Sequence, residues 1–103
     1  MIRRLDIAAG TVAFSDERPA RRRSASVRPL VLLHGFTGSH ASWTTIRVAF
    51  RPTRRVLALD LPGHGASVGG RGFDWSLQST ADLVAETLAT LRISAADVVG
   101  YSM

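Results

Sequence analysis

Two apolar runs constrain this chain most, because each has the length of a β-strand and is apolar on both faces. They cover residues 29–33 and 55–60. Strands that are apolar on both faces lie inside parallel sheets whose two sides are covered by helices. A third short run, which starts at residue 97, has the same character and leads into a Gly-x-Ser sequence. We therefore expect a buried parallel sheet built from these three runs.

An antiparallel hairpin is expected at the start of the chain. Residues 2–8 and residues 10–14 alternate between apolar and polar side chains on either side of a turn at Ala9-Gly10. Residues 15–28 are polar, rich in arginine and interrupted by Pro19, which predicts a long surface loop. No aromatic side chains interleave with these arginines, so we interpret the loop as solvated rather than as a nucleic-acid-binding surface.

Two helices are expected between the strands. Ser39 is placed to cap the first, whose apolar positions are Trp43, Ile46 and Phe50 and which Pro52 ends. The second begins near Ser76 and carries the cleanest amphipathic stripe in the chain, formed by Leu77, Ala81, Val84, Leu88 and Leu91. The resulting order, β-β-β-α-β-α-β with parallel crossovers in the second half, predicts the α/β class.

Composition limits the other classes of protein to which this chain could belong. It has 103 residues, enough for a modest core in one small domain. It contains no cysteine, which excludes a disulfide scaffold and thiolate metal sites. No run approaches the roughly 18 apolar residues of a membrane span, and no apolar segment follows the charged N-terminus. We therefore expect a cytoplasmic protein that binds neither membranes nor nucleic acid.

A turn of distinctive sequence follows each of the three apolar runs. The turns are HGFTGS at residues 34–39, DLPGHG at residues 60–65 and GYSM at residues 100–103. In this order and spacing they resemble the α/β-hydrolase superfamily over essentially the whole chain. The resemblance implies the N-terminal part of an α/β-hydrolase fold. It also implies that residues 1–103 are the first portion of a single domain, with the cap and the C-terminal half beyond Met103.

The resemblance implies a catalytic site around Ser102. A serine on a sharp turn between a strand and a helix has its Oγ held clear of the backbone, where a base can activate it. In the resembled superfamily that base is a histidine oriented by an aspartate, and both follow the serine in chain order. The backbone N–H groups of Phe36 and Met103 correspond by position to the oxyanion hole. Phe36 is also expected to line the substrate pocket, and Tyr101 either faces the substrate or packs.

A second serine, Ser67, matches the full Gly-x-Ser-x-Gly pattern through residues 65–69. It stands several residues past its strand, and further glycines follow where a helix should begin. Because a nucleophilic serine of this kind sits directly between a strand and a helix, we interpret Ser67 as structural.

The three histidines and one aspartate also receive structural interpretations. His34 is expected to shape the loop after its strand through hydrogen bonds, and His64 to shape the turn after Asp60. His40 lies near a helix start and is expected to be exposed. Asp60 ends a strand but precedes Ser102, whereas the catalytic acid of the resembled superfamily follows the serine.

Within the superfamily, the three motifs and Trp43 most resemble the 2-succinyl-6-hydroxy-2,4-cyclohexadiene-1-carboxylate synthases of menaquinone biosynthesis. That resemblance implies elimination of pyruvate from a small-molecule substrate, with no metal or organic cofactor. Two other interpretations stay open: an ester or carbon–carbon bond hydrolase of the same fold, and a non-catalytic hydrolase-fold binding protein or inactive truncated product. Epoxide hydrolases fit less well, because they have aspartate where this chain has Ser102. The oligomeric state is left open.

Overall fold

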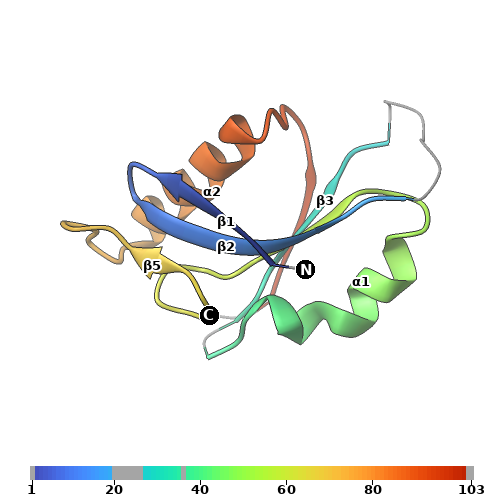
Figure 1. Ribbon diagram of the computed structural model, residues 1–103, viewed down its shortest axis with the longest axis horizontal. Helices are drawn as coiled ribbons and strands as arrows, with labels where there is room; N and C mark the ends of the chain where they lie inside the picture. The colour runs from blue at the N-terminus through green and yellow to red at the C-terminus, as the bar shows by residue number, and fades with distance from the viewer. Residues whose placement is uncertain (1, 20–26, 36, 102–103) are drawn as a thin grey trace.

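The computed structural model describes residues 2–19, 27–35 and 37–101, which form a mixed sheet with helices on both sides (Figure 1). The strands are β1 (Ile2–Ile7), β2 (Gly10–Glu17), β3 (Leu30–Leu33), β4 (Val56–Leu59), β5 (Val68–Gly69) and β6 (Asp97–Gly100). The helices are the 3₁₀ helix η1 (His40–Trp43) and the α-helices α1 (Thr44–Phe50) and α2 (Leu77–Thr90). This order confirms the expected α/β arrangement and adds the 3₁₀ helix η1 and the two-residue strand β5.

The sheet has the strand order β1-β2-β4-β3-β6, and β5 pairs with β2. Strand β3 runs parallel to both β4 and β6, whereas β2 is antiparallel to β4. The expected hairpin is also present, because β1 and β2 pair from Ile7↔Gly10 to Ile2↔Ser15. The three apolar runs therefore lie side by side as parallel strands.

Alternate side chains of β3 and β4 pack on opposite faces of the sheet, as the period of a strand requires. On one face Val31, Leu57 and Leu59 pack with Leu83 and Val84 of α2. On the other face Leu30, Leu32, Val56 and Ala58 pack against Trp43. Helices α1 and α2 accordingly lie on opposite sides of the strands (Figure 1). The inference from doubly apolar runs to a covered sheet is confirmed for β3 and β4.

Strand β2 is longer than the sequence predicted. Residues 15–28 were expected to form one surface loop, but Ser15, Asp16 and Glu17 pair with β4 and Ser15 is buried. Charged residues can extend the strand because arginines on neighbouring segments neutralise them. Asp16 pairs with Arg55, and Glu17 with Arg51. Residues 20–26 of the expected loop lie outside the described residues.

Both helical segments begin at the predicted caps, the first as the 3₁₀ helix η1, which runs on into α1, and the second as α2. The Ser39 side chain accepts a hydrogen bond from Ala41 N, and that of Ser76 accepts one from Ser79 N. The apolar stripes are only partly buried, however. On α2 the buried residues are Leu83, Val84 and Thr87, while Leu77, at its N-terminal end, is 77% exposed.

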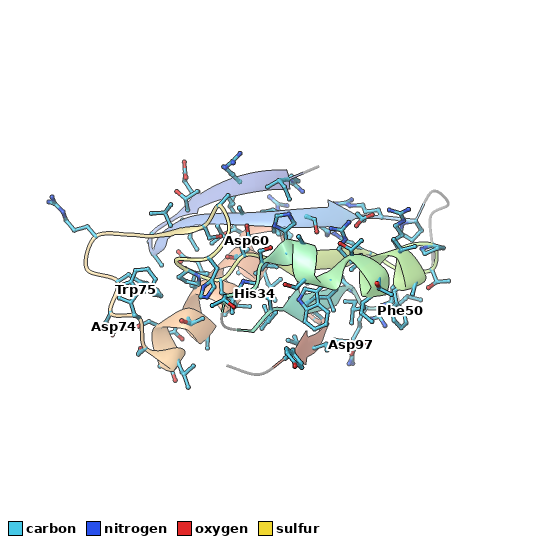
Figure 2. All side chains as sticks on the ribbon, turned by 90° about the horizontal axis from the view of Figure 1, so that it is seen from below. His34, Phe50, Asp60, Asp74, Trp75 and Asp97 are labelled. Atoms are coloured by element: carbon cyan, nitrogen blue, oxygen red, sulfur yellow. The ribbon has the colours of Figure 1, made fainter. Side chains whose placement is uncertain are left out.

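The first helical segment shows a similar difference, because Trp43 packs on the sheet whereas Ile46 and Phe50 are exposed. Figure 2 shows Phe50 at the end of α1 that lies away from His34. The buried face of each helix is therefore set by where the helix crosses the sheet, which its own periodicity does not specify.

Strand β6 is parallel to β3, as expected, but it is not buried. Its four residues are all exposed, with Val98 at 54% and Val99 at 43%. The reason is its position, because among the strands that the structure describes β6 is the last in the sheet order and pairs with β3 alone. The expectation of a buried third strand is wrong for this chain.

Candidate functional site

The three turn motifs emerge at one edge of the sheet. The parallel pairing aligns Leu33 with Leu59 and with Gly100, so the segments that follow β3, β4 and β6 start side by side. In open α/β sheets, ligands bind at the carboxyl ends of the strands. His34 and Asp60, the first residues after β3 and β4, both lie in this region (Figure 2).

His34 is 2% exposed and joins the segment after β3 to the segment after β4. Leu61 N donates to His34 Nε2 at 2.9 Å, and His34 Nδ1 lies 2.7 Å from the Gly35 carbonyl oxygen. Because Nε2 accepts a hydrogen bond, the proton is on Nδ1, which donates to Gly35. Burial lowers the pKa of His34, so the neutral ring is favoured. The expected hydrogen-bonding role of His34 in this loop is confirmed.

Asp60 is fully buried and its carboxylate is held by three donors. Oδ1 accepts hydrogen bonds from His40 N at 2.6 Å and His40 Nδ1 at 2.7 Å, and Oδ2 accepts one from Ala66 N at 2.9 Å. Burial alone would raise the pKa of Asp60, but these hydrogen bonds from Ala66 and His40 hold it below its ordinary value. The carboxylate therefore stays ionised inside the fold.

The expectation for His40 is wrong. Its side chain is only 22% exposed and its ring pairs with Asp60. The physical reason is that the capped turn at Ser39 directs both the backbone N–H and the ring of the next residue to the Asp60 carboxylate. No local pattern in the sequence signals this pair, because its members are 20 residues apart.

Gly65 and His64, in the segment after β4, both serve the structure of this turn. Gly65 has a φ of +53°, and a Cβ at this position would lie 2.2 Å from Asp60 Oδ2. Only glycine therefore allows the carboxylate to sit against this turn. His64 Nδ1 lies 3.1 Å from the Pro62 carbonyl oxygen, and its ring centroid is 4.9 Å from that of His34. The expected place of His64 in the turn is confirmed.

Ser67 is buried and committed to the backbone. Its Oγ donates to the Asp60 carbonyl oxygen at 2.6 Å and accepts from Ala13 N at 2.7 Å. A hydroxyl with both roles used and 5% exposure is unavailable to a substrate. The structural interpretation of Ser67 is confirmed, although it matches the longer serine motif.

A pocket of about 520 Å³ opens between the segment after β3 and the start of the helical layer. It is lined by His34, Gly35, Thr37, Gly38, Ser42, Trp43, Ile46 and Tyr101. Tyr101 is 70% exposed, and its backbone N–H donates to the Leu33 carbonyl oxygen. Trp43 both packs on the sheet and lines the pocket, so its expected core role is only part of its environment.

Three of the predicted site residues lie outside the described residues, namely Phe36, Ser102 and Met103. Their sequence neighbours Gly35, Thr37 and Tyr101 line the pocket. Thr37 has a φ of +65°, a left-handed conformation that β-branched residues rarely adopt. Sequence reasoning missed this strained position.

Within the described ranges, no group of three or more histidine, aspartate or glutamate side chains is arranged to hold a metal ion. No helix in the same part of the chain has the length and apolar character needed to cross a membrane.

Comparison with curated proteins gives relatives with two different names. The chain is 43% identical over 77 residues to the dihydrolipoyllysine-residue acetyltransferase component of the acetoin cleaving system from Pseudomonas putida, covering 73% of this chain and 20% of that protein. It is 41% identical over 76 residues to 2-succinyl-6-hydroxy-2,4-cyclohexadiene-1-carboxylate synthase from Escherichia coli O157:H7, covering 72% of this chain and 28% of that enzyme. The chain thus spans between 20% and 28% of the length of these relatives.

Solved structures share the fold over nearly the whole chain. The N-acyl homoserine lactonase AidH, solved with N-butanoyl homoserine, has a TM-score of 0.82 at 27% identity, covering 98% of this chain and 36% of that one. A protein of Pseudomonas aeruginosa described as an epoxide hydrolase has a TM-score of 0.86 at 26% identity, covering 99% and 33%. The model of the α/β hydrolase fold family matches residues 28–103. Sequence and fold together show that this chain belongs to the α/β hydrolase fold family.

Proposed function

We propose that the protein containing this chain is an enzyme that eliminates pyruvate from 2-succinyl-5-enolpyruvyl-6-hydroxy-3-cyclohexene-1-carboxylate. The observation that carries the proposal is that the segments after β3, β4 and β6 start at one sheet edge, beside a pocket, in a chain that is 41% identical to the synthase over 76 residues. The substrate is a small molecule, and the proposal requires neither nucleic acid nor a membrane. We place the activity in the cytoplasm as part of the same proposal.

In the proposed reaction Ser102 acts with a histidine and an aspartate that follow it in the protein containing this chain. A serine hydroxyl is almost wholly protonated at neutral pH and therefore needs such a base. The serine–histidine pair removes a ring proton, a ring double bond forms, and the carbon–oxygen bond to the enolpyruvyl group breaks. The enolpyruvate that leaves takes up a proton at its methylene carbon and becomes pyruvate. The backbone N–H groups of Phe36 and Met103 donate hydrogen bonds to a substrate oxygen and stabilise the negative charge that develops on it during the reaction.

The pocket beside the motifs suits this assignment. Tyr101, next to Ser102 in sequence, is exposed and lines the pocket, as a substrate-contacting residue must. His34 is held neutral and is fully used in hydrogen bonds to Leu61 and Gly35, so it serves the loop rather than acting as the base. In the sequence, Phe36 stands between Gly35 and Thr37, which both line the pocket, and this supports its assignment to the pocket wall.

A hydrolase that forms an acyl-enzyme is the second candidate, because a lactonase shares the fold at 27% identity. The relative from Pseudomonas putida is named as an acetyltransferase component rather than as a synthase, which also favours acyl chemistry. The two candidates differ in the fate of the serine. An ester hydrolase must pass through a covalent intermediate at Ser102, whereas elimination of pyruvate needs none.

The test uses the protein expressed from its complete reading frame. We expect pyruvate release from the cyclohexene substrate with a kcat/KM well above that for simple aryl esters. Fast ester turnover with a burst and no pyruvate would support the hydrolase. Turnover of neither substrate would support a non-catalytic binding protein. The 103-residue polypeptide is the negative control, since in the resembled superfamily the base and acid follow the serine.

A further inference from the structure

The segment of residues 34–40, which contributes Gly35, Thr37 and Gly38 to the pocket, is attached at both ends to the segment after β4. At the upstream end, Leu61 N donates to His34 Nε2 at 2.9 Å. At the downstream end, His40 N and Nδ1 donate to Asp60 Oδ1 at 2.6 and 2.7 Å. Two consecutive residues, Asp60 and Leu61, therefore hold the two ends of this loop.

Asp60 is itself fixed from several directions, so it can serve as an anchor. Its N–H donates to the Ala13 carbonyl oxygen of β2 at 2.8 Å, and its carbonyl oxygen accepts from Ser67 Oγ. Its Oδ2 accepts from Ala66 N, and Gly65 lies against the carboxylate. A buried carboxylate with this many partners has little freedom to move.

In the contact between His40 and Asp60, His40 is the residue whose position on the loop depends on the hydrogen bonds. Its ring nitrogen and its backbone nitrogen converge on the same oxygen, which fixes both the position and the orientation of the first residue of η1. Hydrogen bonds to an ionised acceptor are about twice as strong as those between neutral groups. The ring donor adds to a contact that the backbone N–H would otherwise make alone.

We propose that His40 is a positioning residue, which fixes the downstream end of the loop of residues 34–40 through Asp60 and so sets the place of the pocket-lining residues Thr37 and Gly38. This inference rests on the proposed function for its catalytic consequence. Its structural consequence is that the mobility of the loop depends on the His40 ring. This consequence can be tested whether or not the proposed function is correct. Misplacement of a reacting group by about 1 Å can lower a rate by about 100-fold.

The experiment compares His40→Ala with His40→Asn in the protein expressed from its complete reading frame. The side-chain amide of asparagine places an N–H donor where the Nδ1 of histidine stands, so His40→Asn keeps the bond that His40→Ala removes. Thr90→Ala is the control, because Thr90 Oγ1 makes a hydrogen bond to the Glu86 carbonyl oxygen on α2, away from the loop. Near-ultraviolet dichroism verifies that each variant is folded.

The first measurement is hydrogen exchange of the backbone amides of residues 35 and 37–39, which requires no substrate. His40→Ala is expected to accelerate their exchange about tenfold relative to the amides of β4, because local opening of the loop loses a restraint. His40→Asn is expected to restore exchange to within about threefold of the original protein. Unchanged exchange in His40→Ala, or equal acceleration in both variants, would overturn the proposal.

The second measurement is steady-state pyruvate release. His40→Ala is expected to lower kcat about tenfold with KM changed by less than about twofold, and His40→Asn is expected to recover most of the loss. A change confined to KM would contradict a positioning role. If the original protein releases no pyruvate, the proposed function fails, and the exchange measurement alone decides whether His40 positions the loop.

Discussion

The Asp16 carboxylate accepts hydrogen bonds from Nε and Nη2 of Arg55 at 2.9 and 2.7 Å, a two-point contact that joins β2 to the start of β4. The Asp16 side chain is 2% exposed and that of Arg55 is 18% exposed. Arg3 on β1 adds a further donor at 2.8 Å. Because these groups come from three neighbouring segments, the pair fixes how the hairpin is joined to the parallel strands.

Replacing Arg55 by alanine is expected to lower the free energy of unfolding by about 2 kcal/mol at pH 7, because a buried carboxylate loses its main partner. Arg3 remains in place and limits the loss. Arg51→Ala is the matched control, since it removes a more exposed pair with Glu17 at 2.7 Å and should cost less than about 1 kcal/mol. Urea unfolding measures both variants, and equal losses would contradict the assignment.

The same carboxylate predicts how stability depends on pH. Burial alone would raise the pKa of Asp16, but the hydrogen bond and charge of Arg55, with the charges of Arg18 and Arg3, hold it below 3.8. Its contribution to stability is therefore complete above pH 3.8 and is lost as the pH falls through the folded-state pKa.

Urea unfolding between about pH 5 and pH 2 should therefore show a falling free energy of unfolding. Asp16→Asn is expected to be less stable at pH 7 and to show a shallower dependence over this range. Some dependence remains in that variant, because the pKa of Asp60 is also lowered in the fold. An identical pH dependence in both proteins would show that Asp16 is not a source of the effect.

The parts of the fold that the sequence predicted are those fixed by local physics. Doubly apolar runs predicted β3 and β4, and serine caps predicted the starts of both helical segments. The extension of β2 could not be predicted, because Asp16 enters the strand only when Arg55, 39 residues away, pairs with it. The His40–Asp60 pair was missed for the same reason, since it exists only after β3 and β4 have paired.

Thr37 offers a prediction about strain in the loop after β3. Its φ of +65° is costly for a β-branched side chain, so Thr37→Gly is expected to raise the free energy of unfolding by about 1 kcal/mol. Thr45→Gly in α1 is the control and should lower it by about 0.3 kcal/mol, because threonine is already a poor helix former and glycine is only slightly worse. Thermal unfolding measures both, and a destabilised Thr37→Gly would show that the loop does not store strain at this residue.

The two edge strands predict how the 103-residue polypeptide behaves in solution. Strand β1 presents charged side chains at Arg3, Arg4 and Asp6, whereas β6 presents exposed valines. An apolar strand edge is a template for pairing with another chain. We therefore expect the polypeptide to self-associate or to be poorly soluble.

Val99→Lys should reduce this self-association, as measured by sedimentation velocity, because a lysine on an edge strand opposes pairing. Val48→Lys is the matched control, since Val48 is 49% exposed and Val99 43%, but Val48 lies on helix α1. If both lysines improve solubility equally, general surface hydrophobicity rather than the β6 edge is responsible. A monomeric original polypeptide would contradict the prediction outright.

The two candidate serines should separate stability from activity. Ser67→Ala leaves Ala13 N without its side-chain acceptor in a buried site and is expected to lower the free energy of unfolding by about 2 kcal/mol. Ser102→Ala is expected to lower kcat for pyruvate release by at least about 100-fold and to change stability by less than about 0.5 kcal/mol. Phe36→Leu should retain most activity, because the proposed contribution of Phe36 is a backbone N–H.

Denaturant unfolding and steady-state kinetics on the protein expressed from its complete reading frame measure the effects of these variants on stability and on activity. Loss of turnover in folded Ser67→Ala, with full activity in Ser102→Ala, would transfer the nucleophile to Ser67 and overturn the proposed site.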